Sequence, residues 1–163
     1  MSNMQSRPAG RRAQARIMNT VNVPMRLFLG LPFPTPAGKR LMLAFIVGRK
    51  TGRTYRQPLS FVRDGDTLLT PGGGAWKLNL AGDRPVRLRI GGRDYYARPE
   101  VIRDPDAVGK LLGVVAAANP MAGRFAAIPK DSDGQFDPER LRQAVQHGFA
   151  IVRWHLVDSA ANP

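Results

Sequence analysis

Residues 41–59 read LMLAFIVGRKTGRTYRQPL, in which an apolar segment is followed by a basic turn and a second strand-like segment. The turn and its exit carry four cationic side chains, Arg49, Lys50, Arg53 and Arg56. Glycine allows tight turns and close approach of a ligand, and successive backbone N–H groups bind anions. The stretch therefore predicts two neighbouring strands and a seat for a phosphate or carboxylate. A solvated hairpin turn with basic side chains is the alternative.

Positive charge is concentrated in the first part of the chain. The 163 residues carry a net charge of +13, from 25 Lys+Arg and 12 Asp+Glu. Residues 1–63 contain 12 basic side chains and no acidic one, whereas the remainder is nearly neutral. So one-sided an excess indicates an anionic partner, which leaves nucleic acid, an anionic bilayer and a polyanionic small molecule open.

The composition excludes several kinds of chemistry. The chain has no cysteine, which removes disulfides, thiol nucleophiles and thiolate metal sites. His147 and His155 fall in different predicted elements, so no metal site is expected. No apolar run reaches the roughly 18 residues of a membrane span, and no signal-peptide core is found, so we expect a cytoplasmic protein. Any redox activity would have to come from a bound cofactor.

Three parts are expected along the chain: a basic N-terminal arm with short helices at residues 1–40, a single domain at 41–157 and a tail at 158–163. In the arm, basic residues stand beside the apolar side chains Leu27, Phe28, Leu29, Leu31 and Phe33. This composition suits peripheral contact with the inner face of the membrane. An arm packed on its own domain or on a second copy is the alternative.

The pattern of the domain is mostly that of β structure. We expect strands at residues 41–47, 54–63, 67–70, 86–90, 93–102 and 149–156. Helices are expected at residues 75–81, 105–118 and 138–147. Pro58 places the second strand at a sheet edge or a bulge. Strands and helices do not alternate, so a small barrel or an α+β sheet is favoured over a Rossmann fold.

Two further segments could approach a ligand. Residues 70–74, Thr-Pro-Gly-Gly-Gly, form a glycine loop that leaves its backbone open. Trp76 and Asn79 are three residues apart, on one face of the predicted short helix, where they offer a flat ring and an amide. An ordinary loop and a core tryptophan are the alternatives.

The order of these motifs resembles that of the deazaflavin-dependent nitroreductase family, whose members use reduced coenzyme F-420, an 8-hydroxy-5-deazaflavin. The motifs are Gly-Arg-Lys-Thr-Gly at 48–52, Pro-Leu at 58–59, Asp-Gly-Asp at 64–66, Gly-Gly at 72–73, Trp-x-x-Asn-Leu at 76–80 and Gly-Gly-Arg at 91–93. The resemblance implies an α+β fold, a split β-barrel related to flavin reductases and pyridoxamine-phosphate oxidases, with flanking helices. It also implies a homodimer.

The resemblance further implies cofactor-binding positions. The phosphate and glutamyl tail would meet Arg49, Lys50, Thr51 and Gly52. Arg56 falls near the next basic position of the family but is shifted by one residue, and Tyr55 occupies that position itself. Pro58 would lie beside the deazaflavin ring. Thr70 falls where the family often has Ser, Gly72 and Gly73 match its glycine pair, and Trp76 and Asn79 match its Trp-x-x-Asn pair, so all five are further expected cofactor-binding positions. Lys77 replaces an aromatic residue common in the family, and the substrate tyrosines of some members have no counterpart, so catalytic residues are not identified.

We therefore expect an oxidoreductase that transfers a hydride from reduced coenzyme F-420 to a small-molecule acceptor: a quinone, a nitro compound or an activated alkene. An FMN-binding reductase of the same fold and a non-enzymatic binder of polyanions or membranes are the alternatives. Nucleic acid is not expected as a partner, because the basic residues surround glycine turns and only 7% of the chain is aromatic.

Overall fold

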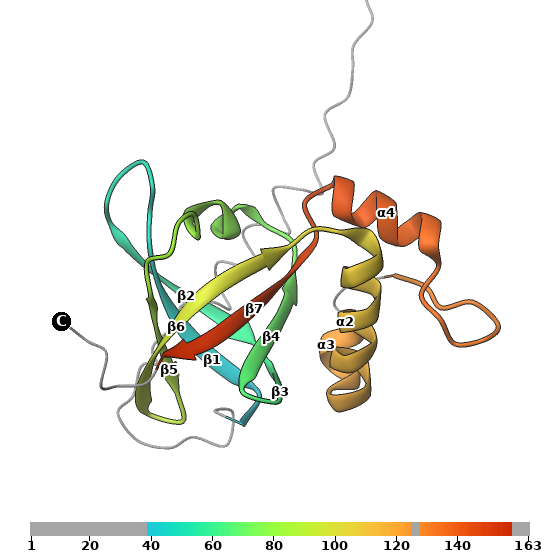
Figure 1. Ribbon diagram of the computed structural model, residues 1–163, viewed down its shortest axis with the longest axis horizontal. Helices are drawn as coiled ribbons and strands as arrows, with labels where there is room; N and C mark the ends of the chain where they lie inside the picture. Colours follow the sequence, from blue (N-terminus) through green and yellow to red (C-terminus); the bar gives the residue numbers. More distant parts are fainter. Residues whose placement is uncertain (1–38, 125–127, 158–163) are drawn as a thin grey trace, which may run out of the picture.

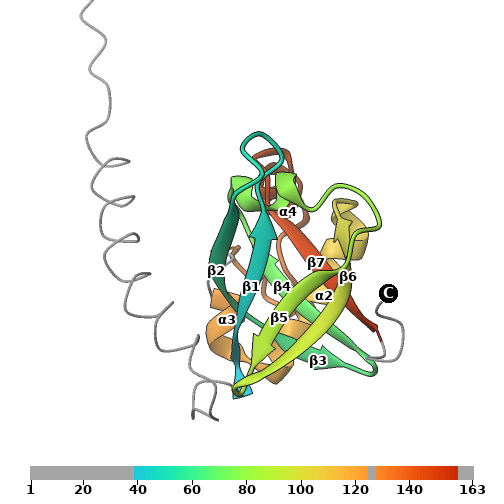
Figure 2. The same cartoon turned by 90° about the vertical axis from the view of Figure 1, so that its left-hand side faces the viewer.

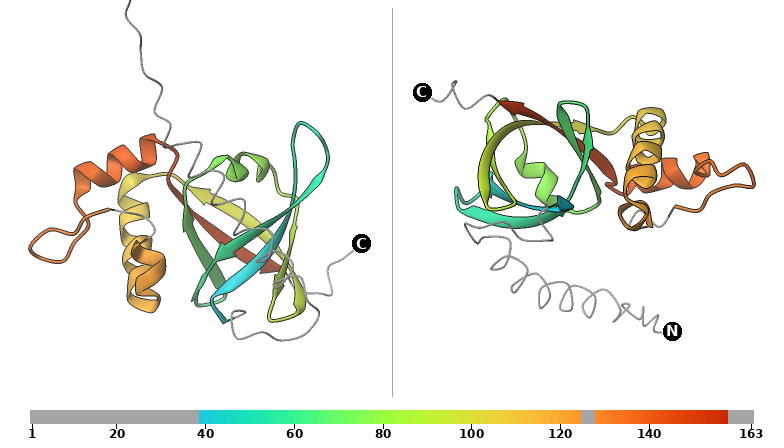
Figure 3. Two further views of the ribbon diagram at one scale, coloured as in Figure 1. Left: turned by 180° about the vertical axis from the view of Figure 1, so that it is seen from behind. Right: turned by 90° about the horizontal axis from the view of Figure 1, so that it is seen from below.

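The computed structural model describes residues 39–124 and 128–157, which form one antiparallel sheet with helices beside it (Figure 1). The strands are β1 (Leu41–Val47), β2 (Thr54–Ser60), β3 (Val62–Asp64), β4 (Thr67–Gly72), β5 (Val86–Ile90), β6 (Arg93–Ile102) and β7 (Ala150–Val157). They pair in the order β2-β1-β5-β6-β7-β4-β3. The sheet curls into a barrel, which appears as a ring in the right-hand view of Figure 3. The expected fold class, an α+β split barrel, is confirmed.

The barrel interior is filled by alternate residues of the strands. From β1, Met42, Ala44 and Ile46 point into this core, as the period of two requires. The 3-10 helix η2 (Ala75–Asn79) covers one end of the barrel, and Leu80, directly after it, is buried in the same core. Figures 1 and 2 show that η2 lies at the same end as the turn between β1 and β2. Two of the predicted ligand-binding segments are therefore neighbours.

Three helices, α2 (Pro105–Ala118), α3 (Pro120–Arg124) and α4 (Pro138–Gln146), pack on the outer face of β3, β4 and β7. Here the same alternation supplies a second core, because Leu68 faces the barrel interior while Leu69 faces the helices. Asp104 caps α2 by accepting a hydrogen bond from the Ala107 N–H at 2.9 Å. The helices lie away from η2 and support the barrel from one side (Figure 1).

The predicted strand 54–63 is wrong in one respect, because it is two strands. The break falls at Phe61, whose N–H donates to the Arg40 carbonyl at 3.0 Å and whose ring turns into the barrel core. Before this point the chain pairs with β1, and after it the chain pairs with β4. The interruption lets a single segment take part in two pairings as the barrel curls.

Two helix predictions also need correction. The expected helix at 75–81 is a shorter 3-10 helix that ends at Asn79. Pro120, expected only to stop α2, also begins α3, because proline suits a first helical position and the Asn119 side chain accepts the Ala122 N–H at 3.3 Å.

The positions of two strands follow the sequence pattern. β7 is apolar and lies between β6 and β4, while β2, which contains Pro58, is an edge strand in the sheet order. No helix in the described part of the chain is long and apolar enough to span a membrane. The helices expected within residues 1–40 and the tail at 158–163 lie outside the described residues, apart from residues 39 and 40.

Candidate cofactor site

The basic turn between β1 and β2 is closed by its own backbone. The Gly48 N–H donates to the Arg53 carbonyl and the Gly52 N–H to the Gly48 carbonyl, each at 2.8 Å. Gly52 has a φ of 67°, which favours glycine. The Tyr55 ring lies against Gly48, where it leaves no room for a Cβ atom, and its hydroxyl is 3.1 Å from Thr51 Oγ1. Local contacts therefore fix the conformation of the turn.

A single amide joins this turn to η2. The Arg49 N–H donates to Asn79 Oδ1 at 3.0 Å, and Asn79 Nδ2 donates to the Trp76 carbonyl at 3.2 Å. The bridge connects residues 30 apart in the sequence and holds the turn against the end of the barrel. The side-chain amide of Asn79 thus makes one accepted and one donated hydrogen bond within the protein.

Two clefts flank this bridge and share Gly48, Arg49 and Asn79. The first, here called the turn cleft, has a volume of about 380 Å³ and is otherwise lined by Lys50, Thr51, Tyr55, Ala75 and Leu78. The second, here called the loop cleft, has a volume of about 560 Å³ and lies between the turn and residues 81–86. Both sizes fall in the range of small-molecule sites.

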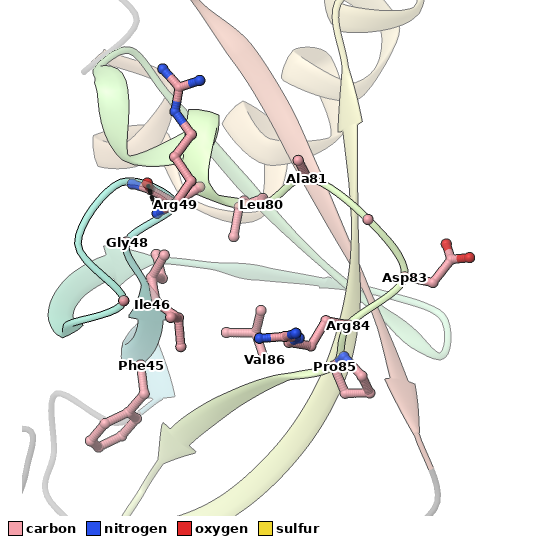
Figure 4. A pocket seen from close by; sticks show the side chains of 14 residues that line it. Phe45, Ile46, Gly48, Arg49, Leu80, Ala81, Asp83, Arg84, Pro85 and Val86 are labelled. Atoms are coloured by element: carbon pink, nitrogen blue, oxygen red, sulfur yellow. Dashed lines mark hydrogen bonds between the residues drawn. The ribbon is translucent and has the colours of Figure 1, made fainter.

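The loop cleft has apolar walls and one arginine within it (Figure 4). Ile46, Leu80 and Val86 line it, and the Arg84 side chain extends into it alongside Val86, whereas Asp83 points away. The Arg49 side chain leaves this cleft and runs towards η2. Arg84 is exposed, and among the described residues it forms no ion pair.

The cations of the turn are not neutralised by any of the described residues. Arg49, Lys50 and Arg53 are exposed, and none of them forms an ion pair within the described parts of the chain. Three like charges on a closed turn create a positive potential that an anionic ligand would relieve. The predicted group Arg49, Lys50, Thr51 and Gly52 is thus together in space, and Asn79 joins it.

The glycine loop is folded over a lysine. Lys77 Nζ donates to the carbonyls of Gly72 at 2.8 Å and Gly74 at 3.1 Å, and the residue is only 4% exposed. Burial, and secondarily the charge of Arg103, lower the pKa of Lys77 to about 8. Trp76 Nε1 donates to the Gly73 carbonyl at 3.2 Å.

Of the other predicted cofactor-binding residues, several also hold structural positions. Trp76 is half-buried and packs against the barrel core. Thr70 is buried, and its hydroxyl accepts the Trp154 Nε1–H at 3.0 Å. Pro58 is half-buried on the edge strand. None of these three lines either of the two clefts. No group of three or more metal-ligating side chains is found in the described residues.

The structure separates Arg56 from the other predicted residues. Adjacent residues of a strand point to opposite faces, so Tyr55 lines the turn cleft while Arg56 lies on the outer face, 6.0 Å from the ring centroid of Phe45. The sequence did point to Tyr55, because Tyr55 occupies the family position from which Arg56 is shifted by one residue. Arg84, by contrast, was marked by nothing beyond its charge, and Lys77 was marked only as a departure from the aromatic residue common in the family.

Comparisons with known proteins bear on the family and the fold of the chain. A family model described as F420H(2)-dependent quinone reductase matches residues 12–122. No curated protein sequence matches the chain. Among solved structures, a protein of unknown function from Agrobacterium tumefaciens is 14% identical with a TM-score of 0.52, covering 77% of this chain and 58% of that chain.

Two further solved structures are similar. The heme storage protein HutZ of Vibrio cholerae is 11% identical with a TM-score of 0.50, covering 74% of this chain and 83% of that chain. An F420-H2 dependent reductase, FDR-A, is 12% identical with a TM-score of 0.49, covering 71% of this chain and 94% of that chain. The similarity to the first two structures concerns the fold alone.

Proposed function

The chain belongs to the F420H(2)-dependent quinone reductase family, and on that premise we propose which residues hold the cofactor and what is reduced. As a member of this family it is an oxidoreductase, with reduced coenzyme F-420 as its hydride donor. In our proposal the basic turn binds the cofactor tail, the segment 70–79 holds the ring, and the acceptor is a quinone.

The tail of coenzyme F-420 carries a phosphodiester and several carboxylates, and the residues of the turn fit such a group. The observation that carries the proposal is that Arg49 and Lys50 are exposed and unpaired among the described residues, on a turn held in place by Asn79. Arginine forks onto phosphate oxygens, and lysine adds a mobile point charge. Thr51 and Gly52 complete the turn, and Tyr55 takes the place first given to Arg56.

The ring is assigned to the neighbouring segment. Gly72 and Gly73 leave open space where a side chain would stand, so a flat ring can approach their backbone. Trp76 and Asn79 follow on η2, with Thr70 and Pro58 on the adjoining strands. When bound, the reduced cofactor supplies the hydride; the protein orients the ring towards the acceptor and excludes water from the path.

The proposal includes a homodimer, as the resemblance implies, and sedimentation or light scattering of the purified protein would measure it. Contact of the N-terminal arm with a membrane, and the division of the chain at residues 40 and 157, stay predictions.

The test is a titration of the purified protein with coenzyme F-420, FMN and haem, followed by fluorescence or absorbance. We expect micromolar or tighter binding of coenzyme F-420 that weakens as salt rises, because exposed cations are screened. FMN has a shorter phosphate tail and should bind more weakly. Absence of coenzyme F-420 binding at micromolar concentration would overturn the proposal, and tighter binding of FMN would favour the flavin alternative.

A second step tests the acceptor. The reduced cofactor is mixed with the protein and a soluble quinone, and reoxidation of the deazaflavin is followed by its visible absorbance. We expect reoxidation in proportion to the quinone added, and faster than with a nitro compound or an activated alkene. Preference for either of those acceptors would correct the substrate class while leaving the cofactor assignment intact.

A further inference from the structure

The buried lysine beneath the glycine loop has no partner for its charge in the described part of the chain. Lys77 is 4% exposed, and no carboxylate of the described residues forms an ion pair with it. The charge that acts on it is that of Arg103, which repels the ammonium. Removing an ammonium from water is costly unless the charge is paired or fully hydrogen-bonded. A methionine or leucine would fill this position without that cost.

The hydrogen bonds of Lys77 are also incomplete. An ammonium has three donors. Two of them are used by the carbonyls of Gly72 and Gly74, at 2.8 Å and 3.1 Å. The third finds no acceptor among the described residues, and the Trp76 ring, whose centroid is 5.4 Å from Nζ, supplies only a cation–π contact. Lys77 is therefore a buried cation with one donor to spare.

Its surroundings belong to the segment that the proposed function assigns to the ring. The loop that Lys77 holds contains Gly72 and Gly73, where a Cβ atom would meet nothing within 4 Å. Trp76 directly precedes Lys77, and Asn79 follows two residues later on η2. A ligand that approaches the open backbone of the loop comes close to a buried positive charge.

We propose that Lys77 is a cofactor-binding residue whose ammonium donates its third hydrogen to an oxygen of the deazaflavin ring system, while its other two donors fix the glycine loop. The inference rests on the proposed function. It assigns the ring's polar edge to Lys77 and the phosphodiester and carboxylates to the basic turn. The two lysines, Lys77 and Lys50, thus recognise different ends of one molecule.

This division predicts different responses to two probes. The first is complete coenzyme F-420, and the second is its tail-less chromophore, an 8-hydroxy-5-deazaflavin with no phosphodiester. Lys77→Met should weaken the binding of both probes about ten- to a hundredfold, as expected for loss of a charged hydrogen bond. Lys50→Met should weaken only the complete cofactor, and exposed Lys110→Met on α2 should change neither.

The pH dependence of ring binding gives an independent readout. The pKa of Lys77 in the free protein is about 8. An oxygen of the bound ring that accepts a hydrogen bond from Lys77 favours the ammonium form, so the affinity of the protein for the ring should be constant below pH 7. It should fall as pH rises above 8, by up to tenfold per unit until the higher pKa of the complex is reached. Arg103 is the charged group that acts on Lys77. Lys77→Met should lack this fall, which subtracts any titration of the ligand itself.

The outcomes separate the two proposals. If the wild-type protein does not bind coenzyme F-420, the proposed function fails. If it binds, but Lys77→Met retains wild-type affinity and pH profile, the role of Lys77 is overturned. Should Lys77→Met not fold, NMR titration of the Lys77 ammonium in the wild-type protein decides, because its pKa should rise on adding the tail-less chromophore. An unchanged pKa, or loss confined to the complete cofactor, contradicts the assignment.

Discussion

The cations of the basic turn and those of β5 differ in what surrounds them. Arg49 and Lys50 are exposed and unpaired among the described residues. On β5, Arg89 makes a two-pronged bond to Asp94, with Nε–Oδ1 at 2.6 Å and Nη2–Oδ2 at 2.8 Å. The Arg87 guanidinium lies 3.7 Å from the ring centroid of Phe45. The cations of β5 thus contact other protein side chains, whereas those of the basic turn form no ion pair with the described residues.

Sheet register produces this difference. Arg89 stands directly opposite Asp94 across the β5–β6 pair, and Arg87 stands opposite Phe45 across the β1–β5 pair. Cross-strand neighbours are the partners that a strand offers its side chains. The turn at Arg49 and Lys50 lies beyond the last β1–β2 pair, at Val47, and has no such neighbours. Arginines of similar appearance in the sequence thus become paired or exposed according to the pairing of the strands.

Removal of two positive charges should weaken cofactor binding when they come from the basic turn, but not when they come from β5. The double variant Arg49→Ala with Lys50→Ala should weaken coenzyme F-420 binding about a hundredfold at low salt, from two lost charged contacts of about 1.5–3 kcal/mol each, partly screened. Its melting temperature should stay near that of the wild type. The matched double variant Arg87→Ala with Arg89→Ala removes the same charge but should retain affinity. Fluorescence titration at two salt concentrations measures both, and equal losses would contradict the distinction.

The shape of the turn provides the next test, because its open charges depend on a fixed backbone. Gly48→Ala places a Cβ against the Tyr55 ring and should lower the free energy of unfolding by about 1–3 kcal/mol. In Gly113→Ala, on the exposed side of α2, the added Cβ meets no atom, so stability should rise by about 0.5–1 kcal/mol.

Denaturant unfolding measures both glycine variants. Adding Tyr55→Ala to Gly48→Ala should recover part of the loss if the clash is its cause. A Gly48→Ala protein as stable as the wild type would show that the turn relaxes freely.

Much of the fold was predictable from local patterns. The strands 86–90 and 93–102 and the helix 105–118 agree to the residue, because alternation, a Gly-Gly turn and an Asp-Pro cap are signals within the segment itself. The break at Phe61 was not predictable. It lies in an apolar run, and only the change of pairing partner as the sheet curls explains it.

The family and the site were predictable to different degrees. The order of short motifs indicated the F-420-dependent proteins, and the family model confirms that resemblance. The assignment of single residues to the cofactor stays a prediction. The burial of Lys77 could not be foreseen, because it depends on how the loop 72–74 folds back over η2. Nor could the Asn79 bridge to Arg49, which requires two distant segments at one end of the barrel.

The smallest expected effect comes from neutralising Asp94, the carboxylate that pairs with the cations of β5. The hydrogen bond from Arg89 holds the pKa of Asp94 below its ordinary value of 3.8. A carboxyl group with a depressed folded-state pKa contributes stability above its unfolded pKa and loses it as pH falls through the folded value. Asp94→Asn should therefore lower stability at pH 7, but by less than about 1 kcal/mol, because the pair is partly exposed.

Thermal unfolding of wild type and Asp94→Asn between pH 7 and pH 2 measures this contribution. The two melting curves should converge below pH 3.8, since the wild-type carboxyl then loses its charge. Asp66→Asn is the control, because Asp66 is exposed and forms no ion pair among the described residues. Asp94→Asn also removes the negative charge beside Arg87 and Arg89 without altering the turn. If coenzyme F-420 affinity then rose as much as it falls on loss of Arg49 and Lys50, added positive charge alone would suffice, and the fixed geometry of the turn would not be what selects the cofactor.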